Sequence, residues 1–384
     1  MRLIHTADWQ IGKPFRQFGE REPVLQEARL VTIESIGALA RREAVAHVLV
    51  AGDVYDSEAP ALRTLLAPLE RMRQFPDVHW HLMPGNHDPH RPKGLWDRVR
   101  ETGVPDNVHL HLAAEPAALG HDAVLLPSPL TRKSEAADLT EWMDRAATPE
   151  GLARIGLAHG SVMGFGREGE ASNPIDPTRP SRAGLSYLAL GDWHRTIQIG
   201  PSAWYAGTPE PDRAGSQETG QVLLVEIRGA GMPPLVTPHR VGRYRWLTMT
   251  EHLAGPEAAD DLEQRVRALP ELSATVIRLV MSGALSLTAR AELDRRLTML
   301  AAATFALDPD TTKLSTRPTP ADLEAIDFGG VLRDAADRLK QLAEDMTRDA
   351  AERRRAEDAL VELFTRVVST PAESARPRRV RELA

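Results

Sequence analysis

Short apolar runs alternate with longer amphipathic stretches in the first third of the chain. Three of these runs are typical of buried strands and lie at residues 2–7, 48–51 and 78–83. Two stretches with apolar residues at helical spacing separate them, at residues 23–43 and 61–74. This order of strands and helices predicts parallel strands joined by right-handed crossovers.

Strand signals dominate the next part of the chain. They fall at residues 108–112, 123–126, 155–158 and 187–190, and one helix is expected near residues 139–146. A stretch rich in Gly, Pro and charge at residues 164–181 predicts a surface loop, and residues 197–205 and 221–227 predict a hairpin pair. We therefore expect an α/β fold whose β-rich second half packs on the first as a sandwich between helical layers.

The composition changes near Tyr244. Helices are expected at residues 257–269 and 287–303 around a strand at 275–281, which predicts a small separate α/β unit. Residues 328–368 form a highly charged helical pattern, and the arginine-rich tail that follows predicts disorder. Because 384 residues exceed one ordinary core, we predict domains at residues 1–245, 246–325 and 326–384.

Polar side chains that can bind metal ions follow several of the apolar runs. Asp53 comes directly after the run at 48–51, where Gly52 permits a sharp turn. The other residues placed in this way are Asp8, Gln10, Asn86, His87, His159, Asp192 and His194. Because the carboxyl ends of parallel strands meet at one edge, these donors should converge. The pattern predicts two divalent ions about 3.5–4 Å apart, with the Asp53 carboxylate between them.

Each candidate residue also has a structural interpretation. Asp8 alone could cap a helix, Asn86 could be a turn residue, and His159 could be a structural histidine. If the metal interpretation holds, His87 faces the leaving-group side, where a histidine can donate a proton. Asp56 or Asp88 would then orient His87, unless either carboxylate caps a helix.

Composition and charge narrow the functional classes. The chain is 42% apolar and 26% charged, and no run approaches the roughly 20 apolar residues that span a bilayer. With no cysteine, disulfides, thiolate catalysis and Cys-ligated metal centres are excluded. The start of the chain does not resemble a secretory signal, so we expect a cytoplasmic protein without membrane association. A net charge of −7 argues against a generally basic surface but permits a local basic groove.

The motifs, taken in order, resemble those of calcineurin-like binuclear metallophosphoesterases. They are Asp8-Trp9-Gln10, Gly52-Asp53, Gly85-Asn86-His87-Asp88, His159-Gly160 and Gly191-Asp192-Trp193-His194. The opening His5-Thr6-Ala7-Asp8-Trp9, the segment from Gly52 to Asp56, and the segment from Tyr205 to Glu210 with Glu218 and Gly220 resemble one subgroup. That subgroup is the nuclease subunit of bacterial SbcCD, with its eukaryotic and archaeal counterparts.

The resemblance implies a fold, a ligand set and partners. The fold is a four-layer β-sandwich flanked by helices, followed by a small α/β capping domain and a C-terminal helical extension. One metal would be held by Asp8, Gln10, Asp53 and His194, the other by Asp53, Asn86, His159 and Asp192, and His87 would be catalytic. Gln10 and Asp192 depart from the family pattern, which has histidine at both positions. The oxygen donor of Asp192 favours Mn²⁺, or alternatively Mg²⁺.

The leading hypothesis from the sequence is a metal-dependent DNA exonuclease or endonuclease subunit for DNA repair or processing. The resemblance implies a partner, an SMC-like coiled-coil ATPase of the SbcC type, and also a homodimer. Two alternatives stay open. One is a metallophosphoesterase of nucleotides or other small phosphoesters, and the other is a DNA-binding scaffold whose metal site has decayed.

Overall fold

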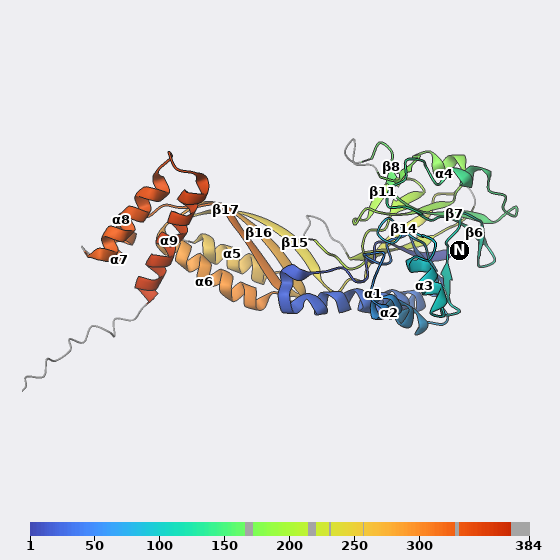
Figure 1. Cartoon of the computed structure of the whole chain (residues 1–384), viewed down its shortest axis with the longest axis horizontal. Helices are drawn as coiled ribbons and strands as arrows, with labels where there is room; N and C mark the ends of the chain where they lie inside the picture. Colours follow the sequence, from blue (N-terminus) through green and yellow to red (C-terminus); the bar gives the residue numbers. More distant parts are fainter. Residues whose placement is uncertain (166–171, 214–219, 230–231, 256, 327–329, 370–384) are drawn as a thin grey trace, which may run out of the picture. The chain divides into compact units, whose positions relative to one another are not determined.

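The computed structural model describes residues 1–165, 172–213, 220–229, 232–255, 257–326 and 330–369. The chain divides into two units, Met1–Trp246 and Leu247–Ala384 (Figure 1). Glu218 of the subgroup motif and the arginine-rich tail lie outside the described residues. Each unit is described by itself below.

The first sheet of the N-terminal unit has the strand order β14-β13-β1-β2-β3-β4. Its parallel strands are β1 (Arg2–Thr6), β2 (His47–Val50), β3 (His79–Leu82) and β4 (Val108–Leu110). Three helices follow successive strands: α1 (Glu22–Arg42), α2 (Leu62–Arg73) and α3 (Leu95–Glu101). The short 3₁₀ helix η1 (Arg16–Arg21) precedes α1. The parallel order agrees with the strand–helix alternation of the sequence.

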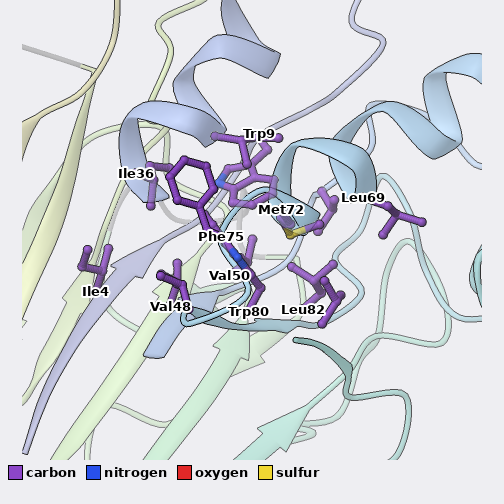
Figure 2. Packing of buried hydrophobic residues seen from close by; sticks show 14 of the residues in the cluster. Ile4, Trp9, Ile36, Val48, Val50, Leu69, Met72, Phe75, Trp80 and Leu82 are labelled. Atoms are coloured by element: carbon purple, nitrogen blue, oxygen red, sulfur yellow. The ribbon is translucent and has the colours of Figure 1, made fainter. Parts of the chain in front are cut away.

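An apolar cluster joins these helices to the first sheet. Alternate residues of the strands, such as Val48 and Trp80, pack against Ile36 of α1 and Met72 of α2. Figure 2 shows this cluster, which also contains Trp9 from the segment after β1. The Trp9 and Trp80 rings meet edge to face, with centroids 6.0 Å apart. The buried Trp9 indole thus anchors the backbone between Asp8 and Gln10.

The second sheet has the order β11-β12-β10-β7-β6-β5. Its strands are β5 (Ala117–Leu119), β6 (Ala123–Ser128), β7 (Ala153–His159), β10 (Tyr187–Gly191), β11 (Ile197–Gly200) and β12 (Ala203–Tyr205). Leu49 and Leu223 of the first sheet share a buried cluster with Leu157 and Tyr187 of the second, so the two sheets pack face to face. The outer face carries η2 (Glu141–Arg145) and α4 (Arg179–Arg182), beside the strand pair β8 (Ser161–Val162) and β9 (Pro174–Ile175). The result is an α/β sandwich between outer layers.

Three local expectations differ from the structure. Residues 221–226 form β13, which pairs antiparallel with β1 and with β14 (Leu235–Arg240), so residues 197–205 form a hairpin by themselves as β11 and β12. The segment near residues 139–146 is a 3₁₀ turn rather than an α-helix. Within the expected loop at 164–181, the described residues include β9 and the start of α4. An apolar run predicts a strand but does not determine which strand it pairs with.

Five histidines line one edge of the N-terminal sandwich. We call His47, His79, His81, His109 and His111 the histidine ladder. His81 aligns with Leu49 of the inter-sheet cluster, so the ladder lies on the inner face of the first sheet. Ring nitrogens of His47 and His81 lie 3.1 Å apart, and those of His81 and His111 lie 3.0 Å apart. Both ring nitrogens of His81 therefore lie within hydrogen-bonding distance of a neighbouring ring, Nε2 beside His47 and Nδ1 beside His111.

The C-terminal unit is built on a three-stranded sheet of order β15-β16-β17. The strands are β15 (Arg245–Ala254), β16 (Thr275–Leu285) and β17 (Ala306–Thr316), and α5 (Ala258–Arg267) and α6 (Leu287–Ala303) share its core. A 3₁₀ turn, η3 (Leu272–Ala274), leads into β16. Three further helices follow: α7 (Pro320–Ile326), α8 (Val331–Glu344) and α9 (Ala350–Ser369).

The last helices pack on their own unit. Leu360 and Phe364 of α9 are buried against Leu287 of α6, Leu323 of α7 and Ala336 of α8. Most of the apolar stripe in residues 328–368 is thus covered within the chain. The roles assigned to residues 246–325 and 326–384, a capping domain and a partner-binding extension, stay predictions. Within the described part of the chain, no helix has the length and apolarity needed to cross a membrane.

Candidate metal centre

The predicted site residues stand at the carboxyl ends of five strands. Asp8 and Gln10 follow β1, Asp53 follows β2, and Asn86 and His87 follow β3. In the second sheet His159 ends β7, and Asp192 and His194 follow β10. Backbone hydrogen bonds join these ends, since Asp8 donates to the Gly52 carbonyl at 3.1 Å and Gln10 donates to the Asp53 carbonyl at 2.9 Å. The strand topology therefore brings the side chains to one edge.

Three of these residues form a compact buried group. One ligand atom from each of Asp8, Asp53 and His159 lies within 4.8 Å of the others. Asn86 joins them, because its Oδ1 lies 3.1 Å from His159 Nε2. Asp192 Oδ1 lies 3.9 Å from the same nitrogen. Two carboxylates and an imidazole, with an amide and a third carboxylate beside them, make a donor set suited to a divalent ion.

The backbone of the site is held in an unusual conformation. Asp8, Gln10, Asp53 and Asp192 all have positive φ, at 55°, 44°, 54° and 106°. Among the described residues, eight that are not glycine have positive φ, and these four candidate ligands make up half of them. Such residues cost conformational energy and persist where the surrounding fold enforces them, which is common at functional sites. Positive φ at four candidate ligands is therefore an observation that favours a functional role for this edge.

Two glycines leave room for the ligand side chains. A Cβ on Gly85 would stand 2.2 Å from Oδ1 of Asp53. A Cβ on Gly52 would stand 2.4 Å from Nδ1 of His159, and Gly52 also has a φ of +86°. Any larger residue would push the carboxylate or the imidazole out of place. The glycines that precede Asp53 and Asn86 in the sequence are therefore part of the site.

The electrostatics of the group favour a bound cation. His159 Nδ1 donates to the Ala51 carbonyl at 2.8 Å, which directs Nε2 toward the carboxylates. Burial lowers the pKa of His159, but the negative charges of Asp53, Asp8 and Asp192 outweigh it and raise that pKa to about 9. Burial raises the pKa of Asp8 to about 6. The buried carboxylates thus hold a proton on His159, and a metal ion would take its place. The residues present fit a divalent ion.

His87 lies at the rim of this group. Its backbone N–H donates to Asp53 Oδ1 at 2.9 Å, and its side chain is 42% exposed. Ring Nδ1 donates to the Asp56 carbonyl at 3.0 Å, so Nε2 is left 3.9 Å from Asp53 Oδ2. An accessible imidazole nitrogen is therefore fixed at the edge of the centre, where it could meet a substrate oxygen.

The two acids predicted to orient His87 have different surroundings. Asp56 is beside the ring, through its main-chain carbonyl and through Oδ1 at 3.9 Å from Nδ1. Asp88 is buried and accepts from the backbone amides of Gly85 at 2.6 Å and Tyr55 at 3.0 Å. Burial and the charge of Asp53 raise the pKa of Asp88 to about 7. Asp88 thus braces the loop that carries Asn86 instead of touching His87.

Gln10 and His194 contact each other, and each also contacts a further polar group. Gln10 Nε2 lies 3.3 Å from His194 Nε2, and the Gln10 amide oxygen accepts from Lys13 at 2.7 Å. His194 Nδ1 lies 3.3 Å from buried Asp212 Oδ2. Burial opposes ionisation of Asp212, but its hydrogen bond with His194 and nearby cations hold its pKa well below the usual range.

Sequence reasoning did not single out Lys13, Asp212 or Ser161 as site residues. Ser161 Oγ donates to Asp192 Oδ2 at 2.9 Å, which orients that carboxylate. Asp212 follows the segment Tyr205–Glu210 by two residues, so the motif itself was the available signal. Lys13 and Ser161 lie close to ligand motifs, yet nothing in their local pattern separates them from surface residues.

Comparisons with known proteins agree with this geometry. Residues 1–175 match the family model described as calcineurin-like phosphoesterase. The SbcD subunit of nuclease SbcCD from Rhodobacter capsulatus is 28% identical over 295 residues, which cover 62% of this chain and 70% of that protein. DNA double-strand break repair protein Mre11 of Haloferax volcanii is 26% identical over 291 residues, covering 72% of this chain and 60% of that protein.

One further relative and one solved structure are also similar to this chain. The uncharacterized metallophosphoesterase YhaO of Bacillus subtilis is 26% identical over 229 residues, covering 55% of this chain and 53% of that protein. Among solved structures, TT1561 of Thermus thermophilus aligns with a TM-score of 0.40 and 12% identity, over 62% of this chain and 98% of that one. The family match covers the strands that carry Asp8, Asp53, Asn86 and His159. Residues 1–175, which carry these four candidate ligands, are thus the part of the chain that matches the calcineurin-like phosphoesterase family.

Proposed function

We propose that the protein is a divalent-metal-dependent phosphodiesterase that cleaves DNA as the nuclease subunit of a complex with an SMC-like coiled-coil ATPase. The observation that carries the proposal is the buried group of Asp8, Asp53 and His159, whose ligand atoms lie within 4.8 Å of one another. His87 lies at its rim with an accessible ring nitrogen. Cleavage of a phosphodiester needs a cation centre and a proton donor for the leaving oxygen, and this edge offers both.

The chain's own residues have separable roles. Asp8, Asp53 and His159 would hold a divalent ion, with Asn86 and Asp192 as further oxygen donors. When bound, such an ion polarises a phosphoryl oxygen and acidifies a water molecule. With both ring nitrogens protonated, His87 would hydrogen-bond the phosphate through Nε2–H and give that proton to the leaving oxygen, while Nδ1–H stays on the Asp56 carbonyl.

Two features support DNA as the substrate. Two of the relatives reported above are named as a nuclease subunit and as a DNA double-strand break repair protein. Arg213 NH2 lies 3.2 Å from His194 Nδ1, and the Arg213 side chain is 71% exposed, so a cation borders the site where a polyanion would approach.

The ATPase partner is supported by exposed apolar side chains in the C-terminal unit. Val331 and Leu332 at the start of α8 are 83% and 43% exposed, and Met346 just after α8 is 78% exposed. Such residues beside a highly charged helix fit a helix-docking surface. Ala336 of the same helix is buried within the unit, whereas Val331, five residues earlier and about 140° round the helix, lies on another side of α8, where a partner could bind.

The activity is tested with the full chain, Mn²⁺ and three substrates. These are end-labelled duplex and single-stranded DNA, bis-p-nitrophenyl phosphate, and p-nitrophenyl phosphate as a monoester. We expect cleavage of DNA and of the diester that stops when EDTA removes the metal. Hydrolysis of the monoester alone, or cleavage that survives complete metal removal, would contradict the proposal.

The partner is tested by a binding assay with a coiled-coil ATPase of the SMC type. Val331→Ser with Met346→Ser should weaken association while leaving diester hydrolysis intact. Met299→Ser is the matched control, because Met299 on α6 is 48% exposed in the same unit. Equal binding by all three proteins would show that α8 is not the docking surface.

A further inference from the structure

A tight turn directs Lys13 back onto Gln10. The Lys13 amide donates to the Gln10 carbonyl at 3.1 Å, and Gln10 and Gly12 have φ of 44° and 90°. The turn places Lys13 Nζ 2.7 Å from Gln10 Oε1 and 2.9 Å from Asp212 Oδ2. The Lys13 ammonium is therefore held by two acceptors beside the metal centre.

This contact decides which way the Gln10 amide faces. An ammonium can only donate, so the atom 2.7 Å from Lys13 Nζ must be the amide oxygen. The amide N–H₂ group then faces His194 Nε2 at 3.3 Å. Gln10 thus turns its one metal-binding atom away from the site and directs a donor into it.

The Gln10 donor covers the nitrogen that His194 would offer to an ion. Asp212 Oδ2 lies 3.3 Å from His194 Nδ1, and Arg213 NH2 lies 3.2 Å from the same nitrogen. An amide N–H₂ group can only donate, so His194 Nε2 is the acceptor of its contact with Gln10.

The two ligand groups expected from the sequence are consequently unequal. The group of Asp8, Gln10, Asp53 and His194 has two of its four donors engaged in hydrogen bonds with one another. The group around Asp53 and His159 also has a contact between two of its donors, Asn86 Oδ1 and His159 Nε2 at 3.1 Å, so the difference between the two groups is the Lys13 ammonium on Gln10. A second ion would have to displace the Gln10 contact with Lys13 and enter beside a fixed positive charge.

The Lys13 ammonium is a fixed positive charge beside Gln10. Its carboxylate neighbours are Asp212 Oδ2 at 2.9 Å and Asp56 Oδ1 at 4.0 Å, and buried Arg29 lies 3.8 Å from the same Asp212 oxygen. A divalent ion bound at Gln10 would be repelled by this ammonium at short range.

We propose that this centre takes a single divalent ion, on the Asp53 and His159 side, and that the Lys13 ammonium replaces the second ion. Gln10 and Asp212 hold the Lys13 ammonium in place. Its positive charge would face the phosphate from the side opposite the bound ion. The proposal rests on the proposed function, because it assumes that this edge is a metal centre. It explains the glutamine as a residue matched to Lys13 rather than as a weakened ligand.

The test is the number of Mn²⁺ ions bound by the full chain after metal removal and equilibrium dialysis. We expect one ion per chain, with the electron paramagnetic resonance spectrum of an isolated Mn²⁺. Gln10→His combined with Lys13→Met should bind two ions and give the spectrum of a spin-coupled pair. Lys13→Arg keeps the charge and should stay at one ion, and Lys133→Met is the matched control at a lysine that is 65% exposed.

Each outcome decides a different point. Two ions in the unaltered protein would overturn the single-ion proposal and leave the proposed function standing. One ion in the Gln10→His, Lys13→Met variant would show that Lys13 does not exclude the second ion. No bound Mn²⁺ in the unaltered protein would overturn the metal centre itself, and with it the proposed function.

Discussion

The histidine ladder predicts how the stability of the N-terminal unit depends on pH. Burial, with the charge of His109, lowers the pKa of His111 to about 4. Burial and the charges of His79 and His109 lower the pKa of His47 to about 4 as well. The pKa of an unfolded histidine is about 6.5. The unfolded chain therefore binds more protons between these values, and the free energy of unfolding falls as the pH drops from about 6.5 toward 4.

The size of this effect follows from the shift at His111. One pKa unit corresponds to about 1.4 kcal/mol, so lowering the pH from 7 to 5 should cost about 2 kcal/mol through His111 alone. The His47 ring is less buried than that of His111 and should contribute less, because solvent screens its charge. His111→Gln removes the titrating group and keeps a polar side chain. The variant should lose about 2 kcal/mol less stability than the unaltered protein over this pH range.

The assay is urea unfolding at pH 7 and pH 5, followed by tryptophan fluorescence. All 7 tryptophans lie within residues 1–246, so the signal reports on the N-terminal unit. His121→Gln is the matched control, because His121 is an exposed histidine outside the ladder. If His111→Gln loses as much stability as the unaltered protein between the two pH values, the account of the ladder is wrong.

Three further predictions concern the metal centre. Gly85→Ala should weaken Mn²⁺ binding by about 10- to 100-fold, because a Cβ would stand 2.2 Å from Asp53 Oδ1; calorimetry measures this. His87→Ala should keep the metal and lose about 10²- to 10⁴-fold in diester hydrolysis, since it removes the proton donor and no ligand. The affinity for Mn²⁺ should rise by about tenfold from pH 7 to pH 8, because binding displaces a proton from His159, whose pKa is raised to about 9; titration at each pH tests this.

Controls and contrary outcomes differ among these three. Gly200→Ala is the control for Gly85→Ala, since a Cβ at Gly200 meets no atom within 4 Å. Loss of metal from His87→Ala would make His87 a ligand instead of a proton donor. Affinity for Mn²⁺ that stays constant between pH 7 and pH 8 would mean that no proton leaves His159 on binding.

Local patterns in the sequence predicted many of the strands and helices of the N-terminal unit. Apolar runs located β1, β2 and β3, and the helical periodicity located α1 and α2 within a few residues. The expected hairpin of residues 197–205 with 221–227 was wrong, because β13 instead pairs with β1 in the other sheet. The continuous apolar run of β13 indicated a buried strand, and that property does not determine which strand it pairs with.

The site was predictable where strand ends carry the ligands. Asp53 and His159 follow strands whose order the sequence indicated, and the structure places them together. The orientation of the Gln10 amide was not predictable from the sequence, because it depends on the contact with Lys13. The partnership of His194 with Asp212 was also hidden, since the residues between them form two strands before the chain returns to the site.

The central claim is that Asp53 organises a metal centre that cleaves phosphodiesters. The most direct measurement compares Mn²⁺ binding and DNA cleavage by the unaltered chain, by Asp53→Asn and by Asp122→Asn, an exposed acid used as the control. The account predicts that Asp53→Asn loses both the bound ion and the cleavage, while Asp122→Asn retains both. Cleavage by Asp53→Asn at a rate close to that of the unaltered chain would contradict it.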